Sequence, residues 1–185
     1  MINDIINSLG QRATSFLYSL DENDTSLVSS LKRQAGFGLI NRLVGRAIPM
    51  ANRSNFQVVG VGPGYLKAKI PLRDNRNHIG TLYAGAMFLV AEVPGGVLAL
   101  LEFGTEYVPI LKEMTISYLK PAQSDVTVEF RLSQEELARL KSDADSRGKA
   151  DFTQQGELRD QQGELVARAT GLYQLRKKGW HCGAS

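Results

Sequence analysis

Residues 77–104 decide the fold, and they read NHIGTLYAGAMFLVAEVPGGVLALLEFG. Within residues 81–103 the strongly polar side chains are those of Thr81, Glu92 and Glu102. A long apolar run without an amphipathic stripe is typical of a helix that is covered on nearly all sides. We therefore expect an irregular polar loop that leads directly into a buried central helix.

Glu92 lies in the middle of this apolar run. Burying a lone carboxylate costs several kcal/mol unless the group is paired, hydrogen-bonded or protonated, so a cleft that uses the acid is one explanation for its position. The alternative is that Glu92 reaches a solvent channel or a structural partner at a subunit interface.

Composition narrows the class of protein. The chain has 185 residues, of which 43% are apolar, and this predicts one domain with an appendage. The formal charge of +3 comes from dispersed residues, so we expect no nucleic-acid partner.

Cys182 is the single cysteine, which fits a reducing cytoplasm. No secretory signal is recognised at the N-terminus, and Glu92 and Pro94 argue against a membrane span.

Helical spacing of apolar residues predicts a helical arm before the first strand. We expect one amphipathic helix over residues 2–20, a second short helix over residues 24–31, and a third that begins after Gly36-Phe37-Gly38. The arm is assigned to residues 1–35. It is interpreted either as a lid or oligomerisation element, or as a layer packed on the outside of the core.

After residue 55 and outside the central helix, apolar and polar residues alternate as is typical of strands. The predicted elements are a hairpin around a Gly-Pro-Gly turn at residues 62–64, strands over residues 107–119, 126–131, 150–159 and 164–175, and a short helix that begins at the capping-box sequence 133–136. Residues 36–178 are assigned to one domain and residues 179–185 to a C-terminal tail. An antiparallel sheet that curls around the central helix accounts for this α+β order, and this arrangement is the hot-dog fold.

The sequence resembles the hot-dog thioesterases of the phenylacetate-pathway type and related uncharacterised hot-dog proteins. Their loop and helix carry Asn or Gln, a Gly, a His-Gly-Gly triplet and an acid, and here Asn77, Gly80, Tyr83-Ala84-Gly85 and Glu92 fall in that register. The later stretch EMTISYLKPAQSD is similar to the family's strand that ends in a Lys/Arg-Pro step.

This resemblance implies hydrolysis of acyl-coenzyme A esters. It assigns Glu92 as base or nucleophile, the backbone N–H of Ala84 as the donor to the developing oxyanion, and Asn77 as the amide that contacts the thioester or the water. In such proteins the acid and the helix-end donor come from different subunits. A homodimer or a dimer of dimers is therefore implied.

The chain departs from the family pattern at three positions. Tyr83 stands where the family usually has His, Ala84 replaces the first Gly of the pair, and Gly96 stands where some relatives have a hydroxyl. The same resemblance places Tyr83 among the catalytic positions, and the positions assigned to substrate binding are Arg76, His78, Gly80, Gly85 and Gly96. These departures leave open a non-catalytic acyl-binding or structural hot-dog module.

No cofactor or metal is expected. His181 and Cys182 lie together without further ligands at metal spacing. The sequence has no Ser-centred nucleophile elbow and no phosphate-binding Gly-rich loop. The candidates for the phosphates of coenzyme A are Arg73, Arg76, Lys112, Lys120 and the Arg176-Lys177-Lys178 run.

Overall fold

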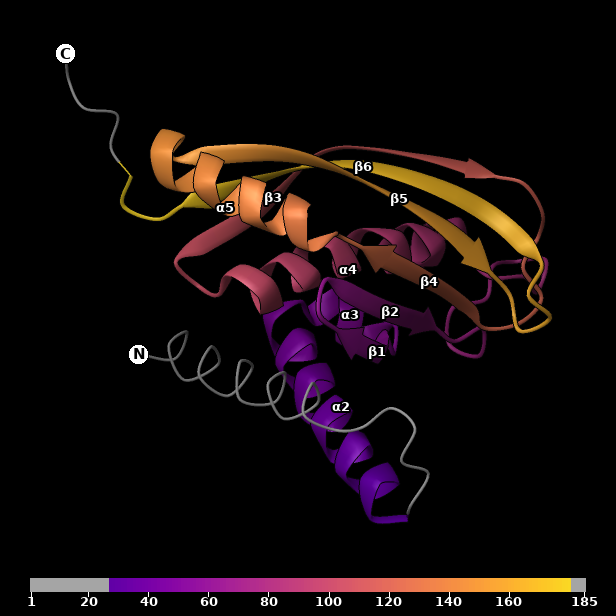
Figure 1. Cartoon of the computed structure of the whole chain (residues 1–185). Coiled ribbons are helices and arrows are strands. Elements are labelled where there is room, and N and C mark those ends of the chain that lie inside the picture. The colour runs from indigo at the N-terminus through magenta and orange to yellow at the C-terminus, as the bar shows by residue number, and fades with distance from the viewer. Residues whose placement is uncertain (1–26, 181–185) are drawn as a thin grey trace.

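An antiparallel sheet of six strands wraps one long helix in this computed structural model, which describes residues 27–180 (Figure 1). The strands are β1 (Gln57–Gly62), β2 (Tyr65–Ile70), β3 (Tyr107–Tyr118), β4 (Val126–Arg131), β5 (Lys149–Arg159) and β6 (Leu165–Lys177). The helices are α2 (Leu27–Ala47), α3 (Pro49–Arg53), α4 (Ala84–Phe103) and α5 (Gln134–Arg147). The helix predicted over residues 2–20, and the pair His181 and Cys182, lie outside the described residues.

The strand order is β1-β2-β4-β5-β6-β3, and neighbouring strands run antiparallel. β3 and β1 therefore form the two edges. β5, β6 and β3 are long and curved, and they arch over α4 in Figure 1. This is the predicted hot-dog arrangement.

The central helix α4 lies against the concave face of the sheet because its apolar residues are buried there. Among them, Val90, Ala91, Leu98 and Ala99 are completely inaccessible to solvent. Full burial of one large aliphatic side chain contributes about 1.5–3 kcal/mol, so this helix organises much of the core. Its length and composition also match a membrane span, but most of it is buried inside the molecule.

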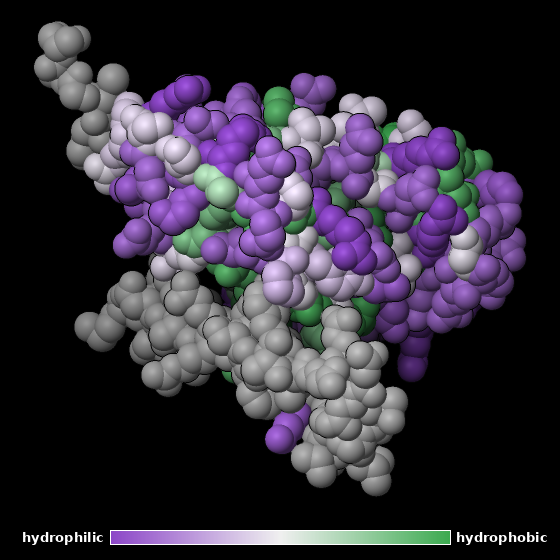
Figure 2. Space-filling model, in the orientation of Figure 1, coloured by the Kyte–Doolittle hydropathy of each residue, from purple (hydrophilic) through white to green (hydrophobic). Residues whose placement is uncertain are grey.

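The prediction that this helix is covered on nearly all sides is wrong for the single chain. Phe88 and Leu100 remain exposed on one face of α4, and the N-cap residue Tyr83 is exposed as well. Val108 and Ile110 on the edge strand β3 are exposed as well. By contrast, the side formed by α5, β4 and β5 is largely hydrophilic, as Figure 2 shows.

Helix α4 approaches the sheet most closely at Gly95. A Cβ atom on Gly95 would lie 2.6 Å from the hydroxyl of Tyr173 and 2.7 Å from Oε1 of Gln154. These distances are shorter than any stable contact of carbon with oxygen, so the approach requires glycine at this position.

Helix α2 is continuous from Leu27 to Ala47, so the predicted helix break at Gly36-Phe37-Gly38 is wrong. Two glycines lower helix propensity by about 1 kcal/mol each. Tertiary packing overrides this cost, because Ile40 and Val44 are buried in the core.

Asn41 connects α2 to the edge strand β1. Its side-chain Nδ2 donates to the carbonyl of Val58 at 3.1 Å, and its Oδ1 accepts from the N–H of Val58 at 2.6 Å. The amide thus occupies backbone groups of an edge strand. Between Val58 and Gly60 the β1–β2 register also shifts, as at a β-bulge.

The sequence predictions for the start of α5 and for the turn between β5 and β6 are confirmed. The hydroxyl of Ser133 accepts from the N–H of Glu136 at 3.1 Å, and the Glu136 carboxylate accepts from the N–H of Ser133 at 2.9 Å. This is the predicted capping box. The turn between β5 and β6 closes with the N–H of Gly163 donating to the carbonyl of Asp160 at 3.0 Å.

Candidate functional site

The loop before α4 is organised by Asn77. Its side-chain oxygen accepts from the N–H groups of Ile79 and Thr81 at 3.0 and 3.1 Å, and its Nδ2 donates to the Thr81 hydroxyl at 2.8 Å. Gly80 takes the positive φ of 85° that this tight loop needs. Asn77 therefore has a structural role in the loop, whatever else it contacts.

A pocket of about 400 Å³ opens between this loop, the start of α4 and the end of β3. It is lined by Asn77, Ile79, Thr81, Leu82, Ala84, Met87, Tyr118, Leu119, Lys120 and Pro121. The structure thus brings together two of the predicted site residues, Asn77 and Ala84. The lining is mainly apolar, with Lys120 as its single cation.

Tyr118 is a pocket residue that the sequence reasoning missed. Lys120, expected from the sequence only as a candidate for the phosphates of coenzyme A, lines the same pocket. The hydroxyl of Tyr118 donates to the carbonyl of Ala84 at 3.1 Å, so the end of β3 is attached to the first residue of α4. Burial raises the pKa of Tyr118, and the nearby Tyr83 adds to this shift. The only sequence signal was the strand ending at Lys120-Pro121, which does not indicate contact with residues some 35 positions earlier.

The start of α4 presents backbone donors. Tyr83 is the N-cap residue, and its carbonyl accepts from the N–H groups of Ala86 and Met87. Within the described part of the chain, the N–H groups of Ala84 and Gly85 form no hydrogen bond. Free N–H groups at a helix start, together with the helix dipole, favour developing negative charge.

The Tyr83 side chain does not line the pocket. It is 57% exposed, and its ring lies over Gly85, where a Cβ atom would come within about 3.0 Å of Tyr83 Cδ1. A tyrosine in place of the family's histidine therefore lies over the first turn of α4, near Tyr118, and does not line the pocket. Gly85 is needed to admit the ring.

Glu92 is half-buried at the middle of α4. Burial raises the pKa of its carboxyl above the ordinary value of 4.5. Among residues 27–180, no side chain or backbone group forms a hydrogen bond or ion pair with this carboxylate. The acid is thus partly desolvated without compensation from the described part of its own chain.

Two polar residues of the sheet lie under this part of α4. The Tyr173 hydroxyl donates to the backbone carbonyl of Glu92 at 2.8 Å. Burial, and then the charge of Glu92, raise the pKa of Tyr173. Gln154 is only 3% exposed, and its amide nitrogen and oxygen have no hydrogen-bond partner in the described structure.

Glu92 and the helix start do not meet within one chain. Eight residues separate Glu92 from Ala84, which corresponds to about 12 Å along the helix axis. The pocket that contains Asn77 and Ala84 is accordingly lined without Glu92.

The positions assigned to substrate binding are spread over this region. His78, Gly80 and Arg76 are exposed in the loop, and none of them lines the pocket. Gly96 lies one turn after Glu92 on the half-exposed side of α4, and a Cβ atom there would meet only Pro109 Cγ, at 4.0 Å.

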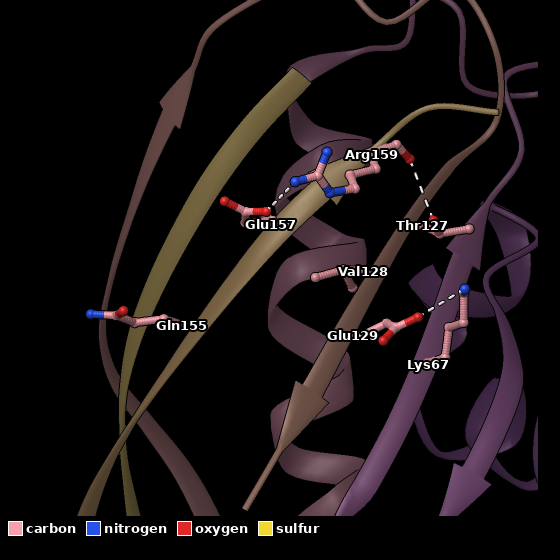
Figure 3. Close-up of a pocket in the computed structure, with 7 residues that line it drawn as sticks. All are labelled: Lys67, Thr127, Val128, Glu129, Gln155, Glu157 and Arg159. Atoms are coloured by element: carbon pink, nitrogen blue, oxygen red, sulfur yellow. Dashed lines mark hydrogen bonds and ion pairs between the residues drawn. The ribbon is translucent and has the colours of Figure 1, made fainter. Parts of the chain in front are cut away.

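A second pocket, of about 410 Å³, lies on the outer face of the sheet where β4 and β5 diverge (Figure 3). Lys67 forms an ion pair with Glu129 at 2.9 Å, and Arg159 forms one with Glu157. The hydrogen bond from Lys67 lowers the pKa of Glu129. Because the charged side chains in this pocket are paired with each other, none of them is left to attract a ligand.

Metal binding has no support in the part of the chain that the structure describes, where His, Cys, Asp and Glu form no group of three or more that could hold an ion.

The family described as "Domain of unknown function (DUF4442)" matches residues 36–173. The chain belongs to this family. A crystal structure of a protein of unknown function from Pseudomonas aeruginosa, described as a probable thioesterase, is 42% identical and has a TM-score of 0.72. That similarity covers 76% of this chain and 95% of the relative.

Two further solved structures share the fold at lower identity. A protein of unknown function from Chlorobaculum tepidum is 16% identical over 75% of this chain and 93% of its own, with a TM-score of 0.68. A thioesterase from Haemophilus influenzae is 15% identical over 78% of this chain and 93% of its own, with a TM-score of 0.63. No curated protein matches the chain. These similarities place the chain in the hot-dog thioesterase-like superfamily, as its sequence predicted.

Proposed function

We propose that this protein hydrolyses acyl-coenzyme A esters in a cleft formed by two copies of the chain, with Glu92 as the general base. The observation that carries the proposal is the half-buried Glu92 carboxylate, which has no hydrogen-bond or ion-pair partner among the described residues. An uncompensated acid of this kind is a functional-site candidate. The solved Pseudomonas aeruginosa relative, described as a probable thioesterase, supports the reaction class.

The reaction needs two groups that this chain offers. Glu92 takes a proton from water, and the water oxygen bonds to the thioester carbonyl carbon. The carbonyl oxygen then carries negative charge, which the N–H of Ala84 and the helix dipole stabilise. The carbon–sulfur bond breaks next. The thiolate of coenzyme A accepts the proton from Glu92, and a carboxylic acid is the second product.

A second copy is required because the base and the oxyanion donor lie about 12 Å apart in one chain. An antiparallel copy of α4 would bring its helix start towards Glu92. Two features favour such pairing, namely the unpaired edge of β3 and the exposed apolar residues Phe88 and Leu100 on α4. The positive end of the partner helix would also favour the ionised form of Glu92.

The acyl group fits the pocket beside the helix start. Ile79, Leu82, Met87 and Leu119 give this pocket an apolar lining, and Lys120 stands at its edge beside Pro121. Its volume of about 400 Å³ is in the range of small-molecule sites. We infer that the pocket receives the acyl chain or the adjacent pantetheine arm.

The second candidate function is acyl binding without hydrolysis. It is favoured by Asn77, whose side chain is already engaged by Ile79 and Thr81 of its own loop. An amide held in this way is less available to position a water molecule. The Tyr83 ring, which lies over Gly85, does not replace the histidine of the family.

The test is to compare wild type, Glu92→Gln and Glu135→Gln on a panel of acyl-coenzyme A esters. Glu135 is an exposed acid in the first turn of α5 and serves as the control. We expect Glu92→Gln to lower kcat by about a hundredfold or more, the usual scale for a positioned acid–base group, with ligand binding retained. Binding without turnover in all three proteins would support acyl binding without hydrolysis. Full activity of Glu92→Gln would show that the active site lies elsewhere.

The shared site is tested separately by sedimentation. We expect a dimer or a dimer of dimers at micromolar concentration. A stable monomer that hydrolyses thioesters would contradict the two-chain cleft.

A further inference from the structure

A basic pocket with an aromatic wall lies where β5 begins and β6 ends. This end of the sheet is on the left in Figure 1. Its volume is about 510 Å³, and its lining residues are Arg147, Gly148, Lys149, Arg176, Lys177 and Trp180. β3 runs from this end at Tyr107 to the loop pocket at Tyr118, a span of roughly 35 Å for an extended strand. The basic pocket is therefore distinct from the loop pocket of the same chain.

The charges in this pocket are not balanced. Lys177 pairs with Asp145 at 2.7 Å, and Arg147 approaches Asp143 at 3.8 Å. In the described part of the chain, Lys149 and Arg176 form no ion pair. Two of the four cations thus have no carboxylate within ion-pair distance, and Lys149 is attracted only at longer range, by Asp151.

Lys149 and Arg176 are also direct cross-strand partners in the β5–β6 ladder. Like charges in directly opposite positions of an antiparallel pair destabilise it. Asp151 follows Lys149 on the same face, but its carboxylate is engaged by Lys112 at 3.0 Å and by Gln174 at 2.7 Å. A bound anion would relieve the repulsion between the two cations.

Arg176 is held in position by a buried residue. Gln174 is only 6% exposed, and its Oε1 accepts from Nε of Arg176 at 2.6 Å. Its Nε2 donates to Asp151, so the orientation of the amide is fixed. The terminal nitrogens of the guanidinium remain available, and their planar geometry suits a phosphate.

Trp180 forms the aromatic wall. Its ring lies against Gly148, where a Cβ atom would come within 2.6 Å of Trp180 Cγ, and Gly148 has the positive φ of 75° that ends α5. The indole is 40% exposed, so part of it faces solvent beside the cations. An indole face is a platform on which a planar base can stack.

We propose that this pocket binds a nucleotide, with the base stacked on Trp180 and the phosphates held by Arg176 and Lys149. A free nucleotide and the nucleotide end of coenzyme A share this chemistry. The site does not depend on thioester hydrolysis, and a protein that cleaves no ester still binds the nucleotide here.

The experiment uses the fluorescence of Trp180, which is the only tryptophan of the chain. The full-length protein is titrated with ADP, with 3′,5′-ADP as the nucleotide end of coenzyme A, with adenosine and with inorganic phosphate. We expect saturable quenching by both nucleotides, weaker effects of adenosine and phosphate alone, and an affinity that falls as salt is raised. Tighter binding of 3′,5′-ADP than of ADP identifies coenzyme A as the source, and equal binding identifies a free nucleotide.

Matched variants separate this site from general charge attraction. Arg176→Gln is expected to weaken nucleotide binding about tenfold, because it removes a charge-assisted contact. Arg168→Gln is the control, since Arg168 lies on the same strand and face but pairs with Glu157 at 3.6 Å. Glu92→Gln is expected to bind the nucleotide as wild type does. No saturable quenching by either nucleotide, or equal weakening in Arg176→Gln and Arg168→Gln, would overturn the proposal.

Discussion

The Tyr173 hydroxyl donates a hydrogen bond to the backbone carbonyl of Glu92 at 2.8 Å. A residue of the sheet thereby fixes the main chain of the central helix at the position of the candidate base. The Tyr173 ring is itself held by stacking on Phe152, with ring centroids 5.4 Å apart. The backbone of Glu92 is therefore set by the core, while its side chain extends to the half-buried side of the helix.

Tyr173→Phe removes only the hydroxyl from this arrangement. We expect the free energy of unfolding to fall by about 1 kcal/mol, because one buried hydrogen bond is lost while the ring remains stacked. Urea denaturation measures this change. An unaltered denaturation midpoint would show that the hydroxyl makes no net contribution.

Gly95 and Gly96 are neighbours with opposite expected responses to alanine. Gly95→Ala forces a methyl group against Tyr173 and Gln154, so we expect destabilisation of about 1–3 kcal/mol. In Gly96→Ala the nearest atom, Pro109 Cγ, is 4.0 Å away, so stability should stay constant or rise by up to about 1 kcal/mol through helix propensity. Thermal unfolding of the pair tests this, and equal losses would contradict it.

The raised pKa of Glu92 predicts a pH dependence of stability. The folded protein holds this proton more tightly than the unfolded chain does, so Glu92 lowers stability as the pH rises from 4.5 through the raised pKa. Where no partner helix start compensates the charge, Glu92→Gln should thus be more stable than wild type at pH 7, and this advantage should vanish near pH 4. Denaturation midpoints at both pH values measure the effect. An equal difference at pH 7 and pH 4 would show that Glu92 is compensated in the assembled protein.

The capping box of α5 predicts the effect of Ser133→Ala. The substitution removes the acceptor for the N–H of Glu136, so we expect a loss of about 1 kcal/mol in the free energy of unfolding. Ser142→Ala in the same helix is the control, because the Ser142 hydroxyl forms no hydrogen bond among the described residues. Losses of equal size in both variants would argue against a specific cap.

Local sequence signals predicted the elements that depend on neighbouring residues. Ser133 and Glu136 start α5 as expected, and the apolar run around Glu92 forms the central helix. The break expected at Gly36-Phe37-Gly38 does not occur, because long-range packing of α2 residues such as Ile40 outweighs glycine propensity. Such packing depends on residues that are distant in sequence.

The candidate site was predictable only in part. Asn77 and Ala84 share a pocket because the loop and the helix start are adjacent in the chain. Tyr118 and Lys120 line the same pocket because the sheet brings the end of β3 next to the start of α4. No local sequence pattern indicates that contact. The cross-strand pair of Lys149 and Arg176 likewise follows from strand register, which composition does not reveal.

The hydrogen bonds of Asn41 affect how the sheet could be extended by strands of other copies of the chain. Its amide occupies the N–H and carbonyl of Val58 on the edge strand β1, while the opposite edge of the sheet, β3, is left open. Open-ended polymerisation through strands needs two free edges on every chain. Because Asn41 occupies Val58 on one of these edges, it opposes the addition of a further strand at β1.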